Sequence, residues 1–76
     1  MTNTRVRPAR YYAAGIDDAA EQEAGYRKLA ALASELGMQG EVERLTRNAE
    51  EMANEGELLI EAACDAGYLP EDLWGQ

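Results

Sequence analysis

The chain has no histidine and no phenylalanine, and only one cysteine, Cys64, among its 76 residues. A single cysteine excludes an internal disulfide, and without histidine the chain lacks the ligands of a structural zinc site. A chain of this length buries only about 60 to 65% of the surface that its unfolded form exposes. We therefore expect it to gain stability from a partner subunit.

Groups that carry acid–base or nucleophilic catalysis are also scarce: the chain has one serine, Ser34, and one lysine, Lys28. Such chemistry needs several groups facing one another in a cleft, and a small helical hairpin offers no evident concave pocket. The acidic stretch 50–57 does not fit a calcium loop, because aligning Gly56 with the glycine of that loop puts alanines at ligand positions. We predict a protein that is not an enzyme and that has no cofactor and no metal site.

Long apolar runs are missing as well. No run approaches the ~20 residues that span a bilayer, and residues 1–10 lack the apolar stretch of a signal peptide. We expect a cytoplasmic protein that does not bind membranes. Cys64 fits a reducing compartment, and we interpret it as a small, half-buried apolar side chain without a role of its own.

Acidic residues are what the sequence has in excess: 15 acids against seven basic residues give a net charge of -8. Residues 1–10 contain Arg5, Arg7 and Arg10 and no acid, whereas residues 11–76 carry a net charge of -11. Because proline and glycine interrupt residues 1–16, we expect a basic irregular arm there and a single acidic helical domain over 17–76.

The domain should contain two long helices. Asp18 and Glu21 form a capping box, so the first helix is expected to begin there and to end at Gly37. Residues 37–40 have the length of a turn between antiparallel helices. The fold class is therefore all-α, a hairpin of a short first helix and a long second helix.

The second helix carries a heptad seam, which is a stripe of small and apolar residues at alternating three- and four-residue steps. Its members are Val42, Leu45, Ala49, Met52, Gly56, Leu59, Ala63 and Ala66. Gly56 has a weak helix propensity and could instead divide this segment into two shorter helices. Because the spacing keeps its phase through Gly56, we favour an unbroken helix up to Gly67. Pro70 then opens a short last helical turn that contains Trp74.

The two helices differ in predicted length, at ~39 Å and ~27 Å, so the shorter one cannot cover the whole seam. Near Leu58 and Ile60 the apolar surface also widens to most of the helix circumference. We expect a symmetric homodimer in which two hairpins form a four-helix arrangement. The core and dimer contact would then be formed by Val42, Leu45, Ala49, Met52, Leu59 and Ala63.

The acids of the second helix indicate a binding surface. Pairs such as Glu57 and Glu61 place like charges four residues apart and destabilise an isolated helix. An acidic face that meets a basic protein surface accounts for them, and a nucleic-acid-binding protein has such a surface. The candidate partner-binding residues are Glu50, Glu51, Glu55, Glu57, Glu61 and Trp74. The apolar anchors beside the acids would be Leu58, Ile60, Tyr68 and Trp74.

In its size, acidity, helical pattern and lack of catalytic residues, the chain resembles the small host-takeover proteins of bacteriophages, such as quorum-sensing anti-activators and anti-CRISPR proteins. The resemblance extends over the whole chain and includes no motif, so no residue role is carried over. It implies an inhibitor that occupies the nucleic-acid-binding surface of a host regulator or nuclease.

Two other functions fit the same sequence. A structural or assembly adaptor would pair with other helices through the seam residues Val42, Leu45, Met52 and Leu59, while its acids only confer solubility. A small DNA-binding regulator would use the arginines of the arm. Direct nucleic-acid binding is the less favoured of the two, because the acidic body repels phosphate.

Overall fold

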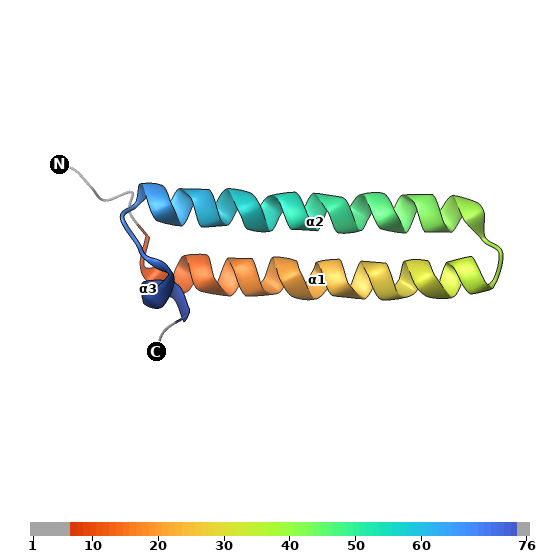
Figure 1. Ribbon diagram of the computed structural model, residues 1–76, viewed down its shortest axis with the longest axis horizontal. Helices are drawn as coiled ribbons and strands as arrows, with labels where there is room; N and C mark the ends of the chain where they lie inside the picture. The colour runs from red at the N-terminus through yellow and green to blue at the C-terminus, as the bar shows by residue number, and fades with distance from the viewer. Residues whose placement is uncertain (1–6, 75–76) are drawn as a thin grey trace.

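The computed structural model describes residues 7–74, which contain three helices: α1 (Ala9–Glu35), α2 (Gln39–Asp65) and α3 (Pro70–Trp74). Helices α1 and α2 run antiparallel side by side, and α3 folds back onto the start of α1 (Figure 1). The molecule is an elongated hairpin with extents of 54 × 26 × 13 Å. The predicted all-α hairpin is confirmed.

Helix α1 begins earlier than the sequence predicted, and the irregular arm over 1–16 is wrong for residues 9–16. The helix starts directly after Pro8, whose carbonyl oxygen accepts a hydrogen bond from the Tyr11 amide at 2.9 Å. Asp18 therefore lies inside the helix, where its carboxylate accepts a hydrogen bond from the side-chain amide of Gln22 at 3.0 Å. Residues 1–6 of the predicted arm lie outside the described residues.

Packing against α2 explains why the helix continues through Gly15. A glycine inside a helix costs about 1 kcal/mol relative to alanine. Tyr12 and Ile16, on either side of that glycine, are buried in one cluster with Ala63 of α2. Because tertiary contacts supply most of the stability of a helix in a protein, this cluster outweighs the local signals.

The two long helices are equal in length, at 27 residues each, so the predicted difference between them is wrong. Helix α1 covers the heptad seam of α2 along its length, and Leu45, Ala49 and Ala63 are buried within a single chain. The argument for a dimer that rested on an uncovered seam therefore fails. The unbroken α2 is confirmed, and a Cβ at Gly56 would lie 3.7 Å from the Ala19 Cβ, so this glycine lies at a close contact between the helices.

The core is thin and has two clusters at opposite ends of the hairpin, with Ala19 and Ala49 buried between them. The cluster at the terminal end has Tyr12, Ile16 and Ala63 as its buried members. The cluster at the loop end consists of Ala30, Ala33 and Leu45, with Tyr26 and Val42 packed against it. Most of the buried positions are alanines, so the helices approach closely but bury little apolar area per residue.

The segment after α2 is fixed by contacts with α1. The Tyr68 hydroxyl donates a hydrogen bond to the Arg7 carbonyl oxygen at 2.8 Å. Tyr68 and Leu73 pack against the terminal cluster. The Asp72 carboxylate accepts a hydrogen bond from the Leu69 amide at 2.8 Å, as in a capping box at the start of α3. The predicted last turn with Pro70 at its first position is confirmed.

Substitutions of glycine by alanine test where the long helices begin and end. Gly67 has a φ of 94°, and Gly37 has a φ of 75°, both in the left-handed region. Gly67→Ala should lower the free energy of unfolding by about 1 kcal/mol, because a Cβ is unfavourable there. The matched change Gly40→Ala, within the first turn of α2 and with open space around the added Cβ, should instead raise it by up to about 0.5 kcal/mol. Urea unfolding of both variants measures the difference, and a loss at Gly40 would contradict the assigned helix start.

Candidate functional site

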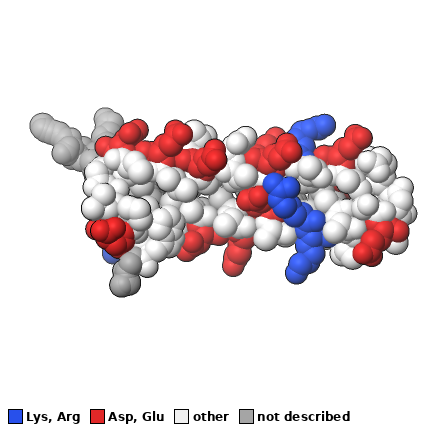
Figure 2. Space-filling model, viewed as in Figure 1, with Lys and Arg blue, Asp and Glu red and all other residues white. Residues whose placement is uncertain are grey.

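Charge is distributed unevenly between the two ends of the hairpin. The described residues of the terminal half, 7–24 and 50–74, carry twelve carboxylates and two arginines. The loop half, residues 25–49, carries three carboxylates and four basic residues. Figure 2 shows acidic side chains along both long edges, whereas most of the visible basic ones gather near the middle. The excess negative charge of the protein is therefore located at the terminal half.

The five predicted partner-binding glutamates of α2 are all exposed, but they do not share one face. At 100° per residue, Glu50, Glu57 and Glu61 lie within about 40° of one another around the helix axis. Glu51 and Glu55 lie on the other flank, and Glu55 lines a groove between α1 and α2. We define the acidic face as Glu50, Glu57 and Glu61. The helical period divides the five predicted glutamates between this face and the flank that carries Glu51 and Glu55.

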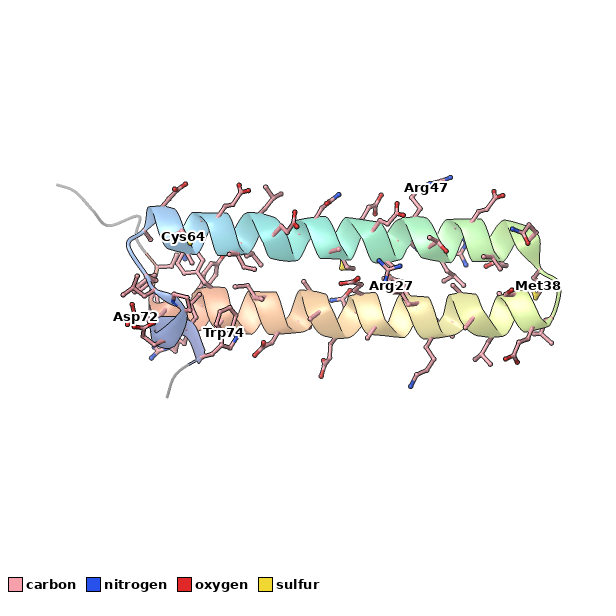
Figure 3. All side chains as sticks on the ribbon, viewed as in Figure 1. Arg27, Met38, Arg47, Cys64, Asp72 and Trp74 are labelled. Carbon is pink, nitrogen blue, oxygen red and sulfur yellow. The ribbon has the colours of Figure 1, made fainter. Side chains whose placement is uncertain are left out.

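The carboxylates of the acidic face have no ion-pair partner among residues 7–74. The ion pairs found there join Arg27 to Glu23 of α1, at 2.9 Å, and Arg44 to Glu41 of α2. Arg47 is the last basic residue before the acidic face, and it points away from α1 (Figure 3). The acidic face can therefore bind an external cation without first breaking an ion pair within the described part of the chain.

Trp74 is half exposed, but it does not lie beside the acidic face. Helix α3, which carries it, lies against α1. Figure 3 shows Trp74 next to α1, at the end of the molecule where Cys64 is also found. The apolar side chains that do flank the acidic face are Leu58, 63% exposed, and Ile60, 39% exposed. Of the anchors expected from the sequence, these two lie beside the carboxylates and Trp74 does not.

A groove lies between the helices, contrary to the expectation that the hairpin has no concave pocket. It has a volume of about 630 Å³ and is open to solvent. Tyr11, Gly15 and Asp18 of α1 line one wall, and Met52 and Leu59 of α2 line the other. Its lining contains no serine, cysteine, lysine or histidine, and its ionisable side chains are those of Tyr11, Asp18 and Glu55.

The seam residues proposed for an adaptor pack inside the hairpin. Leu45 is 8% exposed, and Val42, Met52 and Leu59 are partly buried. Leu59 packs against the terminal cluster, and Val42 packs against the loop cluster. Met52 and Leu59 can be reached from the groove, but another helix could reach Leu45 only if α1 and α2 separated.

The arginines predicted to form a nucleic-acid-binding arm do not lie together on one irregular segment. The Arg7 guanidinium lies 5.0 Å from the centre of the Tyr11 ring, in a cation–π contact. Arg10 is exposed within α1, and Arg5 lies outside the described residues. The described part of the chain therefore presents Arg7 and Arg10 beside a strongly acidic surface, which opposes phosphate binding.

Three further expectations concern metals, membranes and Cys64. No three histidine, cysteine, aspartate or glutamate side chains in the described range 7–74 come together in a way that could hold a metal ion. Neither of the long helices is apolar enough to cross a membrane. Cys64 is exposed rather than half-buried, because it lies one position beyond the seam residue Ala63 and turns away from α1.

Comparison of the chain with protein-family models, with curated protein sequences and with solved structures gives no match. The geometry of the acidic face, with its flanking apolar residues, is therefore the basis for a functional proposal.

Proposed function

We propose that this protein is a non-enzymatic inhibitor that binds, through its acidic face, to the basic nucleic-acid-binding surface of another protein. The observation that carries the proposal is the charge of residues 48–74, which contain eight acids and no basic residue. Glu50, Glu57 and Glu61 lie within this segment on one exposed face of a rigid helix. Such a face attracts arginine and lysine and competes with phosphate for them.

The spacing of these carboxylates supports mimicry of a nucleic-acid strand. At 1.5 Å of rise per residue, Glu57 and Glu61 are ~6 Å apart along the axis, and Glu50 and Glu57 are ~10.5 Å apart. The three carboxylates therefore form a short line of negative charge, as the phosphates of a nucleic-acid strand do. Leu58 and Ile60 would add apolar contacts at the edges of the interface, where they exclude water from the ion pairs.

The adaptor function finds less support, because Leu45 is buried between α1 and α2, and Val42 and Leu59 pack against the core clusters of the same chain. An adaptor that used the whole seam would have to open the hairpin to expose Leu45. The acidic face needs no such rearrangement, since its carboxylates are already exposed.

A capture experiment tests the proposal. The full chain is immobilised, incubated with bacterial lysate, and eluted in a salt gradient, and released proteins are identified by mass spectrometry. We expect a DNA- or RNA-binding protein that elutes at moderate salt, because exposed ion pairs are screened by added ions. The same protein should be displaced by its own nucleic acid. Capture limited to salt-resistant proteins without a nucleic-acid-binding surface would overturn the proposal and favour an assembly role.

A further inference from the structure

Helix α1 carries a second stripe of residues beside the one that faces α2. The stripe that faces α2 includes the buried residues Tyr12, Ile16 and Ala30. The second stripe consists of the residues that come one position before each residue of the first stripe. We call it the outer stripe, and its members are Tyr11, Gly15, Asp18, Gln22, Gly25, Leu29, Leu32 and Leu36. Its steps also alternate between three and four residues, so it follows α1 as a line turned by about 100° from the first.

The loop end of the outer stripe is apolar and exposed. Leu29 is 51% exposed, Leu32 is 52% exposed, and Leu36 is 74% exposed. Leucines at this spacing are typical of a helix that packs against another helix. Helix α2 already packs against the neighbouring stripe, so it does not cover them.

The terminal end of the same stripe is hollow. Tyr11, Gly15, Asp18 and Gln22 line the groove of about 630 Å³ between α1 and α2. A smaller hollow of about 200 Å³, lined by Gln22, Gly25, Tyr26 and Leu29, continues from it toward the leucines. One end of the stripe thus projects and the other end is recessed.

A two-fold rotation brings these opposite shapes together. If the axis passes by Gly25, two α1 helices cross antiparallel, and residue positions that sum to about 50 lie opposite each other. Leu36 of each copy is then level with Ala14 and Gly15 in the groove of the other. A Cβ at Gly25 would have no neighbour within 4 Å, so the two backbones can approach closely at the axis. A patch that is complementary to itself in this way is what a two-fold dimer requires.

Charge favours the same arrangement. An antiparallel pair places the acidic terminal half of each copy beside the loop half of the other, which has four basic residues and three acids. A parallel pair would instead place two acidic halves together. In the antiparallel register Lys28 lies next to Glu21 of the other copy, and both side chains are exposed within one chain. Two such ion pairs form, one on each side of the axis.

We propose that the outer stripe of α1 is the contact surface for a second copy of this chain, which docks antiparallel about Gly25. This dimer differs from the one expected from the sequence, because α2 and its seam take no direct part in the helix crossing. It leaves the acidic face open on both copies, since Glu50, Glu57 and Glu61 lie on the opposite flank of α2 from the groove.

The mass of the full chain in solution tests the proposal. Sedimentation equilibrium over a wide concentration range should give twice the chain mass of 8.3 kDa. The double variant Leu29→Glu, Leu36→Glu should raise the dissociation constant of the dimer by at least about 100-fold, because it places charge at two apolar positions of each copy within the contact. Its helix content by circular dichroism should stay unchanged at low concentration, since both leucines are exposed within one chain. The control Leu58→Glu, on the outer side of α2, should leave the dimer intact.

A charge exchange tests the antiparallel register separately. Lys28→Glu alone should weaken the dimer about tenfold, because two glutamates then meet on each side of the axis. Adding Glu21→Lys should restore the affinity. A parallel dimer would not show this rescue, because Lys28 and Glu21 would lie two helical turns apart along it.

Two results would overturn the proposal. One is a monomeric mass at every concentration, which would leave the leucines to a different protein, and loss of a captured partner on Leu29→Glu would then identify that protein. The other is a dimer that resists Leu29→Glu, Leu36→Glu and dissociates with Leu58→Glu, which would place the contact on α2. The inhibitor function does not depend on either result, because a monomeric variant retains the acidic face.

Discussion

Replacing the three carboxylates of the acidic face by amides should abolish most of the binding to a basic partner. The triple variant Glu50→Gln, Glu57→Gln, Glu61→Gln removes three charges and keeps the shape of the side chains. Exposed ion pairs contribute up to about 1 kcal/mol each, so we expect the dissociation constant to rise about 100-fold. The measurement is titration calorimetry with the captured partner at low and moderate salt, and the variant should also show a weaker dependence of affinity on salt.

The stability of the same variant should change in the opposite direction. Glu57 and Glu61 are four residues apart on one helix, and this pair of like charges costs about 0.2 to 0.5 kcal/mol. The triple variant should therefore unfold at slightly higher temperature while it binds more weakly. This combination excludes loss of structure as the cause of weaker binding.

The flank of α2 that carries Glu51 and Glu55 provides the matched control. Glu51→Gln, Glu55→Gln makes the same chemical change on the same helix, but away from the acidic face. We expect a loss of affinity below about threefold, from the reduced total charge alone. An equal loss in both variants would show that overall charge, and not the acidic face, determines binding. Unchanged affinity in the triple variant would contradict the proposed function.

Helix α2 could be predicted from the sequence because its signals are local and agree with one another. The seam keeps one period from Val42 to Ala66, and this regularity correctly outweighed the weak helix propensity of Gly56. Gly37 and Gly67 were expected to end helices, and both have a positive φ. Each of these features depends only on residues within a few positions along the chain.

The start of α1 could not be predicted in the same way. Gly15 and the capping box at Asp18 are local signals for a helix that begins late, and both are real features of the sequence. They are overruled by the burial of Tyr12 and Ile16 against Ala63, a residue about 50 positions away in the chain. An error in one helix boundary then shortened α1, and the short α1 produced the uncovered seam and the first argument for a dimer.

The candidate site was predictable in part. The excess of acids on α2 was visible in the sequence, and a count of helical angles would have separated Glu55 from Glu57, which lie about 200° apart. The position of Trp74 was not accessible, because it depends on α3 packing against α1 rather than α2. The leucines of the outer stripe recur with the same period as the buried residues beside them, so the sequence does not show which of the two adjacent stripes α2 covers.

Removing the largest aliphatic side chain at the loop end of the core should destabilise the protein strongly. Leu45 is 8% exposed and packs with Ala30 and Ala33 of α1. Substitution of a buried leucine by alanine costs about 2 to 5 kcal/mol, and we expect Leu45→Ala to cost about 2 to 3 kcal/mol because the thin core can partly close over the cavity. A chain of this size has a total stability of roughly 4 to 11 kcal/mol, so this one change removes a large share of it.

Urea unfolding at a fixed, low protein concentration measures this effect, with Leu58→Ala as the control. Leu58 is a leucine of the same helix, but it is 63% exposed, so its substitution should change the free energy of unfolding by less than about 0.5 kcal/mol. The two clusters of the core also predict where Leu45→Ala acts. Amide hydrogen exchange should become faster first in the loop half of the hairpin, while the terminal half is still held by Tyr12, Ile16 and Ala63. If Leu58→Ala were the more destabilising change, the side of α2 that packs against α1 would have to be reassigned, and the acidic face with it.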